Sequence, residues 1–200
     1  SSAMDAEEWK VVTPSNMKDA SATLYSTVWG LRQLGAIDEN VPIGIVECAW
    51  GATSISRWVN TDIIMNSADA EWKRDYLMQI GDNNGLRATD TYYSMARSIV
   101  PYTFKSAIWY QGCQDAGLET YDDYAKDMIN MMRSDFGYDI PYYIVQLPGY
   151  KTTSWDGFRL VQWNIQNLVE DAHIVVTNDT GDANDIHPTD KHIVGKRIAR

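Results

Sequence analysis

Short apolar stretches alternate with helical patterns along this chain. Four of them stand out: residues 41–49 (VPIGIVECA), 106–110 (SAIWY), 140–147 (IPYYIVQL) and 173–177 (HIVVT). Each is nearly continuous, as in strands that are buried on both faces of a parallel sheet. The pattern therefore predicts an α/β fold in which helices cover both faces of the sheet.

Helical spacing fills the intervals between these stretches. The first helix is predicted between Asp19, which can cap it, and Gly35, which can end it. Thr189 can cap the last one. The other predicted helices cover residues 91–99, 121–136 and 158–169, and a mixture of helix and irregular chain covers 55–87. The order is helix–strand repeated four times and closed by a helix, in a single domain of residues 1–200.

The loops that follow the strands are the expected place for a ligand, because parallel sheets bind ligands beyond the carboxyl ends of their strands. Three loops fit this rule: residues 50–53, 111–117 and 181–191. The last contains His187, just past an apolar strand, where an imidazole is well placed to act as a base. An exposed turn histidine without a catalytic role is the alternative interpretation.

Composition and charge narrow the function. The formal net charge of −10 argues against binding to nucleic acid or to an anionic membrane surface. No apolar run is long enough to span a membrane, and Ser1 to Lys10 lack the features of a signal peptide, which leaves the compartment open. Cys48, Cys113 and the histidines are not spaced as metal ligands, so no metal or cofactor is expected.

Several motifs together resemble a known family. They are Val41-Pro42-Ile43-Gly44 leading to Trp50-Gly51-Ala52-Thr53, then Trp109-Tyr110-Gln111-Gly112, then Tyr143 to Leu147, and Asn184-Asp185-Ile186-His187-Pro188 followed by Lys191. In this order they resemble the SGNH-type carbohydrate esterases, in particular the sialate O-acetylesterase and acetylxylan esterase group. The resemblance covers nearly all of the chain.

The resemblance implies a three-layer αβα sandwich with a flavodoxin-like sheet, and an acetylated carbohydrate as substrate. In that family a serine attacks the acetyl carbonyl, a histidine takes its proton, and backbone amides hold the oxyanion. The base then falls on His187 and an oxyanion amide on Gly51, while Asp115 stands where many members have an oxyanion Asn. Gln111, Trp50 and Arg159 become candidate substrate-binding residues. The family also favours a secreted or periplasmic location.

The nucleophile is the main departure from the family pattern. The turn Gly-Gln-Ser-Asn-Met, which follows the first and central strand of the family, has no clear counterpart here. Ser15-Asn16-Met17 spells its end, but Pro14 replaces the Gln and Thr13 the Gly. The domain is therefore expected to be incomplete at its N-terminus. We also expect a gap between the strands at Val41 and Ser106, which an added segment or a partner chain would fill.

Other departures concern the residues around the proposed base and oxyanion. Ala52 replaces a Gly, which matters only if this position needs a positive φ. An ionised Asp115 would repel an oxyanion unless it is protonated or turned elsewhere. Asn184 occupies the usual position of the triad acid, so His187 is oriented either by Asp185 or by a carbonyl group.

Two alternatives to the Ser–His esterase stay open. The chain could be a non-catalytic descendant that binds carbohydrate through Trp50, Trp109 and Tyr110, since flat aromatic rings suit the C–H face of a sugar. It could also be a thiol hydrolase that pairs Cys113 with His187, although burial of a cysteine as a small apolar residue is the simpler interpretation.

Overall fold

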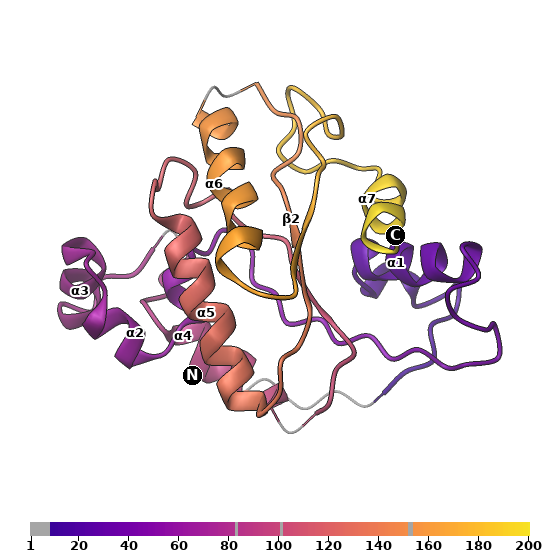
Figure 1. The fold of residues 1–200 in the computed structure, drawn as a ribbon, viewed down its shortest axis with the longest axis horizontal. Coiled ribbons are helices and arrows are strands. Elements are labelled where there is room, and N and C mark those ends of the chain that lie inside the picture. Colours follow the sequence, from indigo (N-terminus) through magenta and orange to yellow (C-terminus); the bar gives the residue numbers. More distant parts are fainter. Residues whose placement is uncertain (1–8, 83, 101, 152–153) are drawn as a thin grey trace.

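A three-stranded parallel sheet lies between two layers of helices (Figure 1). The computed structural model describes residues 9–82, 84–100, 102–151 and 154–200. The strands are β1 (Ala107–Trp109), β2 (Tyr142–Val145) and β3 (Ala172–Val175), in the order β1-β2-β3. Trp109 pairs with Ile144, and Ile144 with Ile174. This architecture confirms the predicted α/β class.

The side chains of the strands alternate between the two helical layers, as the period of two in an extended chain requires. Tyr142 and Ile144 of β2 face one core, which also contains Ala172 of β3. Val145 and Val175 face the other core. The sheet is therefore buried on both faces, which explains why the apolar stretches in the sequence are nearly continuous.

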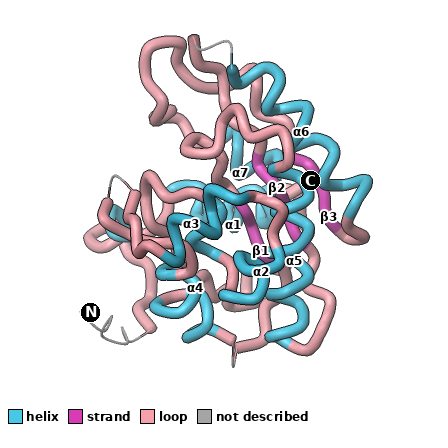
Figure 2. The backbone as a smooth tube through the Cα atoms, turned by 90° about the vertical axis from the view of Figure 1, so that its left-hand side faces the viewer, coloured by secondary structure: helices cyan, strands magenta, loops and turns pink. Residues whose placement is uncertain are grey.

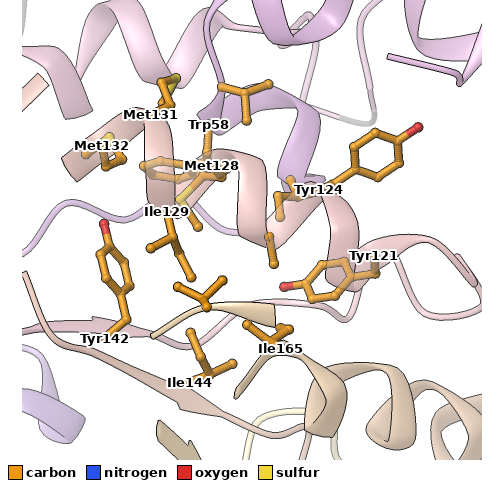
Figure 3. Close-up of a cluster of buried hydrophobic side chains, with 14 of the residues drawn as sticks. Trp58, Tyr121, Tyr124, Met128, Ile129, Met131, Met132, Tyr142, Ile144 and Ile165 are labelled. Atoms are coloured by element: carbon orange, nitrogen blue, oxygen red, sulfur yellow. The ribbon is translucent and has the colours of Figure 1, made fainter. Parts of the chain in front are cut away.

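The larger core lies between the sheet and two long helices, α5 (Tyr121–Phe136) and α6 (Ser154–Leu168). Ile129 of α5 points toward the strands (Figure 3), and Met128 and Met132 belong to the same core. Burial of a side chain such as that of Ile129, which is fully buried, stabilises the fold by roughly 2–3 kcal/mol. The helix α5 has the predicted bounds, because Gly137 adopts a φ of 77° and ends it.

The opposite layer contains α1 (Ala22–Gln33) and α7 (His192–Ile198), which lie side by side (Figure 1). Val194 and Ile198 of α7 pack on the sheet. Two predicted caps differ from the structure. Ser21 caps α1 in place of Asp19, and at α7 it is Asp190 Oδ1, not the expected Thr189, that accepts from the N–H of the first helical residue, His192.

The excursion between residues 55 and 99 consists of short helices at the end of the molecule that is on the left in Figure 1 and faces the viewer in Figure 2. The helix predicted over 91–99 is divided at Met95, whose φ of −128° and ψ of −66° are not helical. The short helices of the chain are η1 (Met17–Asp19), η2 (Ile55–Trp58), α2 (Thr61–Asn66), α3 (Ala70–Leu77), α4 (Asp90–Ser94) and η3 (Ala96–Ile99). None of the described helices is long and apolar enough to cross a membrane.

The predicted strand at 41–49 is wrong. This segment has no regular secondary structure, and within the described residues β1 pairs with β2 alone. The helix–strand unit therefore occurs three times rather than four. The apolar residues of the segment, among them Ile43, Ile45 and Val46, are only partly buried. A strand needs a neighbour for its backbone N–H and C=O groups, and the described chain provides none at this position.

Two helical glycines should respond to alanine in opposite ways. A Cβ on Gly195 would collide with the backbone of Ser26 and Thr27 in α1, whereas a Cβ on Gly157 of α6 would meet nothing within 4 Å. We expect Gly195→Ala to destabilise the fold by about 1–3 kcal/mol and Gly157→Ala to stabilise it by about 0.5–1 kcal/mol. Urea unfolding measures both, and equal effects would contradict the close packing of α1 on α7.

Candidate active site

Two loops at the edge of the sheet where the strands end are joined by hydrogen bonds. Gln111 lies two residues after β1. Its side-chain nitrogen Nε2 donates to the carbonyl oxygen of Thr53 (2.8 Å) and to Asp115 Oδ2 (2.6 Å). The backbone N–H of Ile55 donates to the same carboxylate oxygen (2.9 Å). The loop of residues 50–53 is thereby fixed against the loop of residues 111–117, as expected from their positions after apolar stretches.

Aromatic side chains beneath these loops fix the rotamer of Gln111. Tyr121 is fully buried, and its hydroxyl donates to Gln111 Oε1 (2.8 Å) while it accepts from Trp109 Nε1 (2.9 Å). Trp58 Nε1 donates to Thr53 Oγ1 (2.9 Å). Because every polar atom in this group has a partner, the network is rigid. Sequence patterns showed Tyr121 only as a helix residue and gave no sign of this role.

The carboxylate of Asp115 is 7% exposed. Burial raises its pKa to about 6, against the opposing effects of the hydrogen bonds from Gln111 and Ile55 and of the Arg57 charge. Arg57 is itself buried and bonded to Asp82 (3.2 Å). The carboxylate of Asp115 accepts hydrogen bonds from the loop backbone and from Gln111. It therefore holds the two loops together.

The loop of residues 50–53 offers a backbone amide at its surface. Within the described chain no hydrogen bond takes up the N–H of Gly51, whose carbonyl oxygen accepts from Asn84 Nδ2 (2.6 Å). Ala52 has a φ of 54°, which is the left-handed conformation that favours glycine. The indole of Trp50 is 48% exposed beside them. The replacement of Gly by Ala at position 52 is therefore strained.

The loop that carries His187 is held by the segment after β2. Gly149 N–H donates to Thr180 O (2.6 Å), and Lys151 N–H donates to Ala183 O (3.2 Å). His187 is exposed, and Asp185 Oδ1 accepts from its backbone N–H (2.8 Å). In the described chain no hydrogen bond reaches the imidazole ring, so Asp185 shapes the turn and leaves the ring unoriented.

Ser15 and Cys113 are not joined to His187 by a hydrogen bond. Ser15 is exposed, and its hydroxyl bonds to Thr13 Oγ1 (2.9 Å). Cys113 is exposed too, and partial desolvation raises the pKa of its thiol, which leaves it a weaker nucleophile. Neither side chain forms a nucleophile–base pair in this structure.

The guanidinium group of Arg159 in α6 bonds to nearby groups of the chain and is not directed into an open pocket. Its Nε donates to Leu147 O (2.8 Å), its Nη2 donates to Pro148 O, and its Nη1 donates to Asp156 (2.7 Å). The arginine therefore fixes the chain where β2 leads into α6. Gln162, which is fully buried, accepts from Leu147 N–H (2.9 Å) and donates to Gln111 O (3.2 Å), which ties the ends of β1 and β2 together.

Metal ligation has no support in the described part of the chain, where no group of three or more His, Cys, Asp or Glu residues could hold an ion. The groups that the described loops present at this edge of the sheet include the His187 imidazole, the free backbone amide of Gly51, the Cys113 thiol and the exposed Trp50 ring.

Comparison with known proteins leads to the same family as the sequence motifs. Residues 28–200 match the family described as "Carbohydrate esterase, sialic acid-specific acetylesterase". The structure is similar to the crystal structure of a carbohydrate acetylesterase from Xanthomonas citri, with a TM-score of 0.79 and 31% sequence identity. The match covers 98% of this chain and 43% of that one. No curated protein matches the sequence significantly. The chain belongs to the sialic acid-specific acetylesterase family of carbohydrate esterases.

The buried Asp115 should make stability fall as pH rises. Its raised pKa means that the folded state holds a proton between pH 3.8 and about 6 that the unfolded state has lost. The free energy of unfolding should therefore decrease over this range by about 3 kcal/mol from this group. Asp115→Asn keeps an oxygen acceptor without the charge, so the decrease should disappear. Urea unfolding from pH 4 to 7 measures it, and the exposed Asp62→Asn should keep the wild-type profile.

Glycine at position 52 should relieve the strain of the left-handed Ala52. That conformation costs alanine about 1–2 kcal/mol, and the added freedom of glycine in the unfolded chain offsets part of the gain. We expect Ala52→Gly to raise the free energy of unfolding by up to about 1 kcal/mol. Ala70→Gly at the start of α3 should lower it by about 1 kcal/mol. A loss of stability in both variants would contradict the assigned strain.

Proposed function

We propose that this chain forms the α/β core of an esterase that removes acetyl groups from sialic acid or other acetylated glycans. The reaction would follow a Ser–His acyl-enzyme route, in which His187 takes the proton of a serine hydroxyl and later activates water. The observation that carries the proposal is the bond from Gln111 to Thr53. It holds the loop with the free Gly51 amide against the end of β1, in a member of an acetylesterase family.

The oxyanion would bind to the backbone amide of Gly51. An amide donor that is fixed before the reaction stabilises the tetrahedral intermediate without reorganisation in the transition state. Asp115 would contribute to this oxyanion hole through the loop that it fixes, since its carboxylate already accepts from Ile55 and Gln111. Trp50 would contact the sugar, and Gln111 and Arg159 would support the pocket wall through their backbone bonds.

The nucleophile would come from one more parallel strand between β1 and the segment 41–49. Three features support this part of the proposal: the edge of β1 that no described strand covers, the partly buried apolar residues of 41–49, and the half-buried Leu24 and Val28 of α1. A strand in this position would cover all three and would end beside Gly51. A segment outside the 200 residues or a partner chain could supply it. Ser15 is the alternative within the chain.

Loss of His187 should abolish ester hydrolysis. We expect His187→Ala to lower kcat for p-nitrophenyl acetate by about 10²–10⁴-fold, the usual contribution of a general base. His173→Ala provides the matched control, because His173 is an exposed histidine of β3. Equal rates for wild type and His187→Ala would contradict the proposed base.

A serine-directed phosphonate followed by peptide mapping identifies the nucleophile. Label on a serine of the added strand supports the strand proposal, and label on Ser15 refutes it. The absence of both turnover and label, together with retained glycan binding, would contradict the esterase. It would favour a carbohydrate-binding protein of the same fold. Turnover that is lost on alkylation of Cys113, without unfolding, would indicate the thiol mechanism.

A further inference from the structure

The loop that carries His187 is held differently in its two halves. Backbone bonds join the first half to the segment after β2, among them the bond from Gly149 N–H to Thr180 O (2.6 Å). The second half, residues 186–191, forms hydrogen bonds only within the loop and to the first turn of α7, as far as the described residues show. The position of His187 relative to the other loops of the site therefore depends on contacts of another kind.

One such contact joins the second half of the loop to the end of β1. The Nζ atom of Lys191 lies 5.3 Å from the centre of the Tyr110 ring, in a cation–π contact. Lys191 follows His187 by four residues, and Tyr110 directly follows β1. Apolar packing adds to this attachment, since Pro188 is buried and Ile186 packs against the larger core.

The surroundings of both partners strengthen the contact. Burial raises the pKa of Tyr110 to about 12, so its ring stays neutral at physiological pH. The side chain of Lys191 is half-buried, and desolvation lowers its pKa, although the nearby Cys113 and Asp185 oppose this shift. A partly desolvated ammonium group gains more from the face of an aromatic ring than a fully hydrated one does.

The carboxylate of Asp185 extends this contact to the backbone of the proposed base. It attracts the ammonium group of Lys191, and its Oδ1 accepts from the backbone N–H of His187 (2.8 Å). The ammonium group therefore interacts both with a ring at the end of β1 and with the carboxylate that shapes the His187 turn.

The same end of β1 also holds the loop with the proposed oxyanion amide. Gln111 is the neighbour of Tyr110 in the chain, and its Nε2 donates to Thr53 O (2.8 Å) in the loop that contains Gly51. The loop of the base and the loop of the amide are thus attached to adjacent residues. Such a common attachment matters, because a displacement of about 1 Å between reacting groups can cost roughly 10²-fold in rate.

We propose that Lys191 is a positioning residue of the esterase site. Its cation–π contact with Tyr110 holds the His187 loop at the end of β1 and so fixes the proposed base relative to the Gly51 amide. The inference rests on the proposed function, because it concerns the placement of that base. Lys191 acts through the loop and not on the substrate.

Amide hydrogen exchange of the intact 200-residue chain, followed by NMR, tests the contact without any need for turnover. Lys191→Met removes the charge and keeps an apolar side chain, so the N–H groups of Asp185 and His187 should exchange about two- to thirtyfold faster. Lys191→Arg keeps a cation and Tyr110→Phe keeps a ring, so both should exchange like the wild type. Lys196→Met, which changes an exposed lysine of α7, is the matched control.

Hydrolysis of p-nitrophenyl acetate provides the readout that a purely structural role would not move. A displaced base slows the chemical step and leaves substrate binding intact, so Lys191→Met should lower kcat by about tenfold or more and leave KM unchanged. Lys191→Arg should restore most of the lost kcat. Lys196→Met should react like the wild type.

Unchanged exchange in Lys191→Met, or exchange that rises equally in α5, would overturn the proposal. A wild-type kcat in a variant whose loop exchanges faster would overturn it as well. If Lys191→Met does not fold, Tyr110→Leu removes the ring in place of the charge and should give the same result. A wild type without turnover refutes the esterase alone, since exchange still decides the Lys191 contact, and turnover with unchanged exchange refutes the positioning role alone.

Discussion

A buried carboxylate organises the edge of the sheet where the strands end. Asp115 accepts from the Ile55 backbone and from Gln111, which in turn donates to the Thr53 carbonyl. The loops on either side have no regular secondary structure, so these side-chain bonds decide their shape. The exposed positions of Trp50 and the Gly51 amide depend on them. Desolvation of this carboxylate costs free energy, but the hydrogen bonds that it accepts give the two loops a defined shape.

Long polar side chains perform the same task around β2. Gln162 bonds to the ends of both β1 and β2, and Arg159 binds the carbonyl oxygens of Leu147 and Pro148. Thr177 donates to Gln146 O (2.6 Å), which connects the ends of β2 and β3. A sheet of three short strands cannot fix its loops through strand pairing alone. The buried amide, guanidinium and hydroxyl groups supply the missing connections, and single truncations among them should move several loops together.

Local patterns predicted the elements that depend on local forces. Residues 121–136 form a helix with the expected bounds because apolar spacing and Gly137 specify both its buried face and its end. The segment 41–49 has an equally clear apolar pattern, yet it is not a strand, because strand formation needs a distant partner. The positions of the loops 50–53, 111–117 and 181–191 after apolar stretches are what predict them as the site. The bonds of Tyr121 and the φ of Ala52 were beyond sequence patterns, since both arise from tertiary contacts.

One edge of β1 has no strand partner among the described residues, and this edge affects how the chain behaves in concentrated solution. Backbone N–H and C=O groups on a free strand edge can pair with the same edge of a second molecule. The net charge of −10 opposes such contacts at low ionic strength, and salt weakens that repulsion. Where this edge stays uncovered, self-association of the chain is favoured in concentrated, high-salt solution.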